Sequence, residues 1–345
     1  MMRIGLCYDL RSAYLAAGFG EEETAEFDRE STIEAIESAL GELGHQTERI
    51  GNLPDLMARL LAGGSWDLVF NLAEGMRGSG RESEVPALLD AWGIAYTFSD
   101  PLVSALTLHK GMAKHVLRDQ GVPTTDFRVV ESDAEARAVD LPFPLFVKPV
   151  AEGTAKGIDG RSRVETMPEL VARCRLVRER HSQPALVEPF LPGREFTTSI
   201  VGSGARARAL GTLEVVLREG AEPYCYSYLN KERCEELCEY RLVEGTLASE
   251  CERIALRAWR GLGCRDAGRV DLRLDAGGRA QVLELNPLPG LHPEHSDLPI
   301  LCTAVGMPYA ELIRAVVDSA SERRASGHAA RRPPPFARAA LQAAG

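Results

Sequence analysis

The stretch from Asp266 to Leu298 decides the fold, and it reads DAGRVDLRLDAGGRAQVLELNPLPGLHPEHSDL. Apolar residues alternate over 270–274 and gather again over 282–285, which is typical of two short strands. The pair Gly277-Gly278 lies between these segments and favours a tight turn. The stretch therefore predicts a β-hairpin.

Three oxygen-bearing side chains lie on this hairpin. Asp271 falls on the first strand, while Glu284 and Asn286 fall two residues apart on the second and share one face. Carboxylate and amide oxygens without a neighbouring His or Cys favour Mg²⁺ bound together with substrate phosphates, with Mn²⁺ as the alternative ion. The other interpretation is a solvated hairpin face. It is less favoured because strand interiors disfavour Asp and because a rigid turn, 287–290, follows.

Composition limits the classes of function. The chain has 345 residues, 45% hydrophobic and 26% charged, which predicts a soluble enzyme-sized protein of two or three domains. A net charge of −10 argues against a nucleic-acid partner. The absence of a membrane-length apolar run and of a leader pattern argues against a membrane partner. Eight Cys without paired spacings fit a reducing compartment, so we expect a cytoplasmic protein.

The N-terminal third shows alternating periods. Strand-like segments at 3–9, 47–50 and 67–72 alternate with helical segments at 31–43 and 54–61, which predicts a wound α/β domain with a parallel sheet. The segment between Asp9 and Glu26 has no clear period and is predicted to be a loop. Residues 321–345 are rich in Ala, Arg and Pro, and we expect a disordered tail there.

The hairpin resembles the metal-binding end of the ATP-grasp fold. The segments GRVD and LELNPLPG carry this resemblance, and the following His- and Ser-containing loop is similar to that of D-alanine–D-alanine ligases, over about residues 67–318. The resemblance implies an α/β fold, α+β in places. It implies an N-terminal wound α/β domain at 1–109, a central ATP-grasp lid subdomain at 110–195 and a C-terminal antiparallel-sheet catalytic subdomain at 196–320.

A lysine at a strand end and a glycine-containing loop indicate a phosphate site. Lys148 ends the strand-like segment 143–149, and 152–157 reads EGTAKG; a fixed lysine neutralises phosphate charge while loop N–H groups close over it. Lys110 and Lys114 stand one helical turn apart and are typical of a solvated face, which is how we interpret Lys114. Glu195 alone would also fit a charge opening an edge strand. The resemblance implies that ATP contacts Lys110, Lys148, Glu152, Gly153, Thr154, Ala155, Glu188, Phe190, Leu191, Glu195 and Lys231.

The aromatic segment 224–231 reads YCYSYLNK and resembles the mobile substrate-covering loop of these ligases. The resemblance implies a γ-phosphate contact for Lys231, and stabilisation of the tetrahedral oxyanion by Arg269 and the Gly290 N–H. Cysteines at 225, 234 and 238 raise the alternative of a zinc site, but their spacing lacks the close pairs of common zinc sites.

The substrate end departs from the family. Candidate substrate residues are Glu30, Glu74, His295 and Ser296. Residues 29–32 read REST and resemble the motif in which these ligases carry an ammonium-binding Glu, which would assign that role to Glu30. Counting back from the end of the first long helix instead places Phe27 at that position. Glu74 stands in place of a loop His, and Phe98 stands in place of a small Gly, where a bulky ring is expected to narrow or reshape the substrate pocket. We therefore expect a first substrate other than D-alanine, with the alternative that these positions changed without changing the substrate.

We expect an ATP-dependent carboxylate–amine ligase that joins two amino acids through an acyl phosphate. One alternative is an ATP-grasp ligase that makes a different dipeptide or amide in specialised metabolism. Another is a non-catalytic nucleotide-binding regulatory protein. Retention of the three metal-ligand candidates, Arg269 and the lysines argues against the regulatory alternative. The expected partners are small amino acids, and a homodimer is the candidate assembly.

Overall fold

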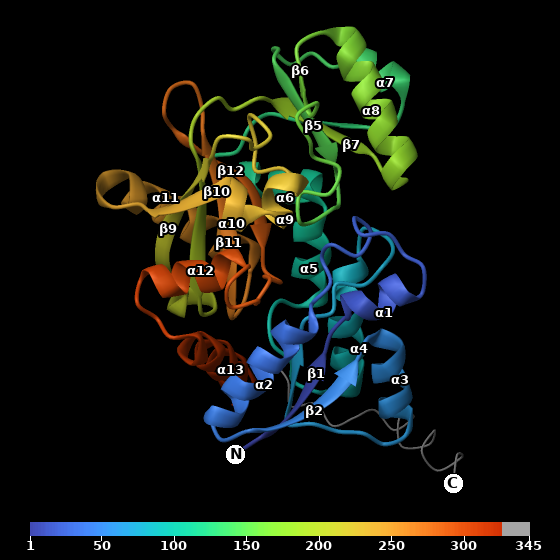
Figure 1. Ribbon diagram of the computed structural model, residues 1–345, viewed down its shortest axis with the longest axis vertical. Helices are drawn as coiled ribbons and strands as arrows, with labels where there is room; N and C mark the ends of the chain where they lie inside the picture. Colours follow the sequence, from blue (N-terminus) through green and yellow to red (C-terminus); the bar gives the residue numbers. More distant parts are fainter. Residues whose placement is uncertain (326–345) are drawn as a thin grey trace.

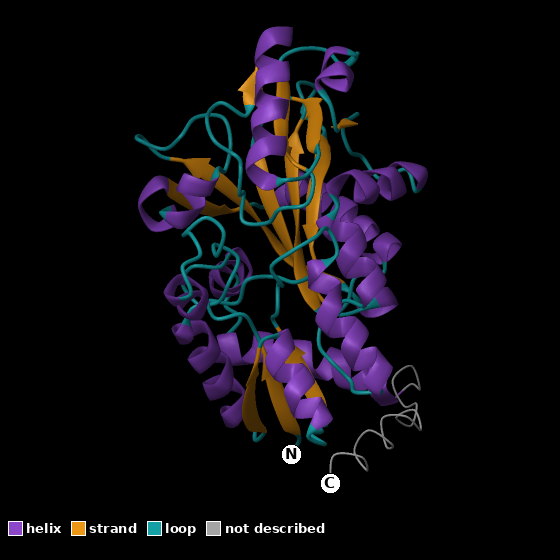
Figure 2. Ribbon diagram, turned by 90° about the vertical axis from the view of Figure 1, so that its right-hand side faces the viewer, coloured by secondary structure: helices purple, strands orange, loops and turns teal. Residues whose placement is uncertain are grey.

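The computed structural model describes residues 1–325, which form three β-sheets arranged along the long axis of the molecule (Figures 1 and 2). The N-terminal sheet is parallel with the order β2-β1-β3, as the alternating periods predicted. It is built from β1 (Arg3–Cys7), β2 (Gln46–Gly51) and β3 (Leu68–Asn71), and the helices of this region are α1 (Arg11–Ala16), α2 (Glu30–Glu42), α3 (Leu53–Leu61) and α4 (Glu84–Trp92).

The middle of the chain forms an antiparallel sheet at the other end of the molecule (Figure 1). This lid has the strand order β4-β7-β5-β6, and two helices join it to the N-terminal sheet. Its elements are β4 (Arg128–Val130), α7 (Asp133–Arg137), β5 (Leu145–Pro149), β6 (Arg163–Val164), α8 (Met167–His181) and β7 (Ala185–Pro189), and the joining helices are α5 (Pro101–Leu108) and α6 (Lys110–Asp119).

The third sheet is antiparallel, has the order β10-β9-β8-β11-β12 and contains the predicted hairpin at one edge. Its strands are β8 (Glu195–Val201), β9 (Arg208–Leu217), β10 (Cys238–Leu242), β11 (Ala267–Leu274) and β12 (Ala280–Asn286). The helices of this part are α9 (Tyr228–Glu232), α10 (Cys234–Leu237), α11 (Gly245–Leu262), α12 (Asp297–Ala304) and α13 (Tyr309–Ala325). Three sheets in this order match the expected fold class.

Two predictions of irregular structure are wrong. The segment expected to be a loop after Asp9 contains the short helix α1. The expected disordered tail begins too early, because α13 continues to Ala325. The remainder of that predicted tail, residues 326–345, lies outside the described residues.

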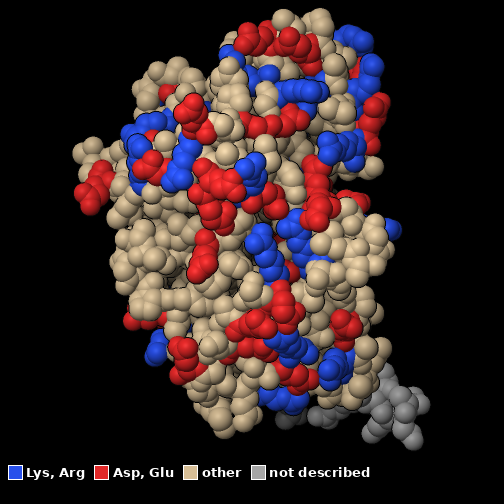
Figure 3. Space-filling view, viewed as in Figure 1, with Lys and Arg blue, Asp and Glu red and all other residues tan. Residues whose placement is uncertain are grey.

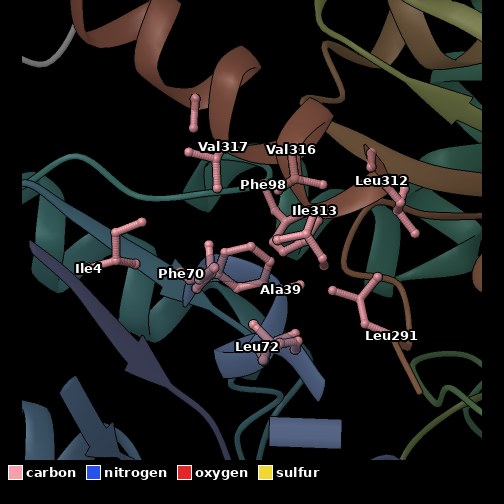
Figure 4. Packing of buried hydrophobic residues seen from close by; sticks show 14 of the residues in the cluster. Ile4, Ala39, Phe70, Leu72, Phe98, Leu291, Leu312, Ile313, Val316 and Val317 are labelled. Atoms are coloured by element: carbon pink, nitrogen blue, oxygen red, sulfur yellow. The ribbon is translucent and has the colours of Figure 1, made fainter. Parts of the chain in front are cut away.

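The C-terminal helix packs on the N-terminal sheet. Ile313 and Val317 of α13 join Ile4 and Phe70 of the first sheet in one buried cluster (Figure 4). Phe98 packs into the same cluster, its ring centroid 5.7 Å from that of Phe70. Burial of apolar side chains from both ends of the chain holds the first and third sheets together, which fixes the space between them.

No single helix among residues 1–325 is long and apolar enough to cross a membrane. The bent pair α12 and α13 passes that test together by length and composition alone.

Candidate functional site

A cavity of about 800 Å³ lies between the lid and the third sheet. Nine of the eleven residues predicted to contact ATP line it: Lys110, Lys148, Glu152, Ala155, Glu188, Phe190, Leu191, Glu195 and Lys231. Of the other two, Thr154 lines a neighbouring cavity and Gly153 is not among the lining residues of either.

Glu188 is the centre of charge in this first cavity. Its carboxylate lies 2.8 Å from the Lys148 ammonium nitrogen and 2.9 Å from that of Lys114. Burial raises the pKa of Glu188, but the two ammonium groups outweigh burial and lower it to about 2. The prediction of a solvated Lys114 is wrong, because its side chain is 1% exposed and burial lowers its pKa.

Phe190 and Arg273 line this cavity, and Arg163 also packs on the Phe190 ring. The Phe190 ring has the guanidinium carbons of Arg163 and Arg273 5.1 Å from its centroid. Arg273 also lies 3.0 Å from the Glu195 carboxylate, and burial raises the pKa of Glu195. An aromatic ring can stack on a purine, and a nearby carboxylate can accept from sugar hydroxyls.

The hairpin brings the three predicted metal ligands together. Asp271 on β11 stands directly opposite Glu284 on β12, and Asn286 Nδ2 donates to Asp271 at 3.1 Å. Arg269 lies 2.6 Å from Asp271, and Lys110 lies 3.2 Å from Glu284. Burial raises the pKa of Glu284, but Lys110, Lys231 and Lys148 outweigh it and lower the pKa overall. Asp271 behaves oppositely, since burial raises its pKa and Arg269 offsets this only partly.

The glycine-containing loop 152–157, the candidate phosphate site, is held in place by Glu26 from the N-terminal part of the chain. Glu26 accepts from the Gly153 amide at 2.5 Å, from Lys156 Nζ at 2.5 Å and from Arg81 at 2.8 Å. Burial raises the pKa of Glu26, but Arg81 and Lys156 outweigh it and lower the pKa to about 2. Sequence reasoning missed both ionic partners of Glu26, because the acidic run 21–26 lay in the segment interpreted as a loop.

A second cavity, of about 750 Å³, opens between the first domain and the loop after the hairpin. Gly290, His295 and Ser296 line it, as do Phe27 and Thr154. A Cβ atom at Gly290 would lie 2.7 Å from Ser296 Oγ, so a larger residue there would have to displace the Ser296 side chain.

Four residues line both cavities: Tyr226, Lys231, Arg269 and Asp297. Lys231 Nζ lies 4.9 Å from the Tyr226 ring centroid. Arg269 lies 3.3 Å from Asp297, and Tyr226 OH donates to Asp297 at 3.3 Å. The predicted catalytic residues Lys231 and Arg269 therefore stand where the two cavities meet, and Gly290 borders the second. Asp297 was missed, because the Pro-containing loop gave no sign of the helix α12 that begins there.

Two of the four candidate substrate residues lie elsewhere. Glu30 pairs with Arg49 and half of its side chain is exposed, and it is not among the residues lining either cavity. Glu74 is also absent from both linings, and burial raises its pKa well above the usual value. The expectation that Phe98 narrows a substrate pocket is wrong, because its ring lies in the core. Its φ of 71° lies in the region that favours glycine.

Cys234, Glu235 and His295 lie close enough together to hold a metal ion. This group differs from the three cysteines that the sequence raised as an alternative zinc site. Cys234 Sγ lies 3.7 Å from His295 Nδ1, which lies 2.8 Å from Glu235. Burial raises the pKa of Cys234 to about 11, so the free thiol is protonated at neutral pH. Cys225 and Cys238 are not members of this group.

Acidic and basic side chains are mixed over the face of the molecule that Figure 3 shows. Figure 3 shows Lys and Arg beside Asp and Glu in the middle of this face, with neither sign covering it. On such a surface a small charged ligand would interact with individual charged side chains, because no large area of one charge sign is present to attract it.

Comparison with known proteins assigns the chain to a family. The model of the D-ala D-ala ligase C-terminus matches residues 116–318. A D-alanine–D-alanine ligase of Bordetella avium is 34% identical over 92% of this chain and 95% of its own length. An uncharacterised protein of Sinorhizobium fredii is also 34% identical, over 84% of this chain and 87% of its own length.

Solved structures support the fold. The D-alanine–D-alanine ligase of Bacillus anthracis complexed with ATP matches with a TM-score of 0.69 at 22% identity, over 94% of this chain and 99% of that chain. The VanG D-Ala:D-Ser ligase of Enterococcus faecalis matches with a TM-score of 0.71 at 19% identity, over 92% and 99% of the two chains. With the sequence relatives at 34% identity, these matches show that the chain belongs to the D-alanine–D-alanine ligase family of ATP-grasp enzymes.

Proposed function

We propose that the protein joins two amino acids at the expense of ATP, with the nucleotide in the first cavity and the amino acids in the second. The observation that carries this proposal is the junction, where Lys231 and Arg269 line both cavities. A carboxylate entering from the second cavity would meet the terminal phosphate of ATP there. The resulting acyl phosphate would then be attacked by the amine of the other substrate.

Cations at the junction make this encounter feasible. A carboxylate and a triphosphate repel each other, and that repulsion is strongest in a site with little water. Lys110 and Lys148 line the nucleotide side, while Lys231 and Arg269 stand at the junction. We assign Lys231 to the γ-phosphate, and Arg269 with the Gly290 N–H to the tetrahedral oxyanion. Closure of the segment around Lys231 would keep water from the acyl phosphate.

The hairpin fits Mg²⁺, with Mn²⁺ as the alternative. Asp271, Glu284 and Asn286 present only oxygen donors once the Asn286 amide turns its oxygen inward, and two are carboxylates facing each other across the strand pair. These three residues would hold the ion, which would offset phosphate charge when bound. Without the ion, Lys110 balances the charge of Glu284 and Arg269 balances that of Asp271.

The nature of the first substrate is the open part of the proposal. Phe27, rather than a carboxylate, lines the second cavity at the position expected for the ammonium ligand. The neighbouring Asp28 also lines it, and burial together with Asp9 raises the pKa of Asp28 to about 8. We propose a dipeptide other than D-alanyl-D-alanine. Domain bounds at 109, 195 and 320, a cytoplasmic location and a homodimer stay predictions.

A panel of D- and L-amino acids, offered singly and in pairs, tests the function. ADP release is measured by a coupled assay and the products by mass spectrometry. We expect ADP release that depends on amino acids and matches dipeptide formation, with weak self-ligation of D-alanine. Efficient D-alanyl-D-alanine synthesis without a better substrate would contradict the specificity proposal alone. ADP release that no amino acid changes would instead favour an ATPase or a regulatory protein.

A further inference from the structure

The ligation chemistry needs a group that accepts a proton from the amine. An amino acid enters at neutral pH as an ammonium ion, which has no lone pair with which to attack a carbonyl. The amine must reach the acyl phosphate where the two cavities meet. The four residues that line both cavities, Tyr226, Lys231, Arg269 and Asp297, are therefore the first candidates.

Three of these four are donors. Lys231 and Arg269 carry ammonium and guanidinium groups, which have no acceptor atom. Burial and the nearby Asp297 raise the pKa of Tyr226 well above its usual value, so its phenol stays protonated and donates to Asp297. Asp297 is the one carboxylate among them.

The surroundings of Asp297 leave it room to bind an ammonium group. The residue is 9% exposed and begins α12. Its Oδ1 accepts from Tyr226 OH and its Oδ2 lies 3.3 Å from Arg269 Nη1, which lies closer, at 2.6 Å, to Asp271. Two carboxylate oxygens offer about four acceptor positions, so these two long contacts do not saturate the group.

Other acceptors are placed less well. The acceptors that line only the second cavity are Glu26, Asp28, Glu232, His292 and His295. Glu26 pairs with Arg81 and Lys156, Glu232 with Arg11, and His295 with Glu235. Five further carboxylates line only the first cavity, on the nucleotide side: Glu152, Glu188, Glu195, Asp271 and Glu284.

Given the proposed ligase function, on which this inference rests, the geometry points to Asp297 as the catalytic residue that takes the proton from the attacking amine. One ammonium proton moves to Asp297, and the nitrogen lone pair then attacks the carbonyl carbon of the acyl phosphate. The new C–N bond forms, and the C–O bond to phosphate breaks with its electron pair leaving on phosphate. A second nitrogen proton leaves with the phosphate, so the product is a neutral amide.

Two nucleophiles of different basicity test this role. Hydroxylamine is largely unprotonated at neutral pH and traps acyl phosphates as hydroxamates without a base. For Asp297→Asn we expect peptide formation to fall by about 10²-fold or more, the usual contribution of a positioned base, while hydroxamate formation falls far less. Asp297→Glu should recover part of the peptide activity. Asp126→Asn, on a side chain that is 72% exposed, is the matched control and should leave the ratio of the two products unchanged.

The other outcomes are also decisive. If Asp297→Asn lowers peptide and hydroxamate equally, or lowers neither, Asp297 is not the proton acceptor. Asp297→Ser provides the same comparison should the Asn variant fail to fold. A wild-type protein that forms neither product with any amino acid would overturn the ligase function itself, and with it this role.

Discussion

The ammonium nitrogen of Lys148 lies 2.8 Å from a carboxylate oxygen of Glu188, and both side chains are buried in the first cavity. The pair is set by two adjacent lid strands, because Glu188 on β7 stands opposite Phe146, two residues before Lys148 on β5, so that the two side chains lie diagonally on the sheet. Although burial lowers the pKa of Lys148, Glu188 outweighs it and raises that pKa, so the amine is charged when a triphosphate arrives.

Lys148 and Lys231 should affect different steps. Lys148→Ala is expected to weaken ATP binding by about 10- to 100-fold, the value of a hydrogen bond to a charged group. Lys231→Ala should lower kcat by about 10²-fold while changing the Kd for ATP far less, because Lys231 is placed where charge develops. Calorimetric ATP titration and steady-state kinetics measure the two effects, with the exposed Arg241→Ala as control. Equal effects of both variants on Kd would refute the division of roles.

Lys114 should matter for stability. Lys114→Met leaves the buried Glu188 carboxylate with one cation, and breaking a buried ion pair costs about 3–5 kcal/mol. We expect a clear fall in the denaturant midpoint, whereas a solvated lysine would give a change near zero. Arg118→Met, on the same helix with a side chain that is 44% exposed, is the control. A Lys114→Met variant as stable as the wild type would show that the ion pair is not formed in solution.

Glu284 should be essential for turnover. Glu284→Gln keeps the shape of the side chain but removes a charge that balances Lys110 and that we assign to the metal. Loss of several kcal/mol of metal stabilisation predicts a fall in kcat of about 10²-fold or more. The variant should also need a higher Mg²⁺ concentration for half-maximal rate. Glu322→Gln, in an exposed pair, is the control. Near-normal turnover at limiting Mg²⁺ would remove Glu284 from the metal site.

Glu26 should give the protein an acid-sensitive contact between its first domain and the lid. Its folded pKa of about 2 is below the ordinary 4.5, so its stabilisation is complete above about pH 4.5 and disappears as the pH falls toward 2. Glu26→Gln should therefore be less stable than wild type at pH 7, by about 3 kcal/mol, with a difference that shrinks below pH 4.5. Denaturant unfolding at pH 7, 5 and 3.5 measures this. A difference that does not depend on pH would contradict the assigned ionisation.

Local patterns were enough to predict the hairpin and its three oxygen donors. Asp271, Glu284 and Asn286 lie within one short stretch, where side-chain alternation and one turn determine the geometry. The strand-end position of Lys148 was predictable for the same reason.

Partners distant in sequence were not predictable. Lys114 is buried only because Glu188, on another strand, faces it, and the helical spacing of Lys110 and Lys114 carries no trace of that carboxylate. The contacts of Glu26 with Arg81 and Lys156 join three separate segments of the chain. Asp297 lies at the junction of the cavities because helix α12 begins there, and the proline-containing loop before it gave no sign of that helix. The error at Phe98 is of a different kind. The resemblance to the family placed this residue at the substrate pocket, but packing against Phe70 places its ring in the core.

Oxygen transfer tests the central claim most directly, namely that a substrate carboxylate takes the γ-phosphoryl group at the junction. The amino acid that best promotes ADP release is supplied with its carboxylate labelled with ¹⁸O, and the phosphate produced is analysed by mass spectrometry. An acyl phosphate predicts that one ¹⁸O atom moves from the carboxylate to the phosphate in each turnover. Phosphate that carries no label while ADP is released would show that water is the acceptor, and the account would be wrong.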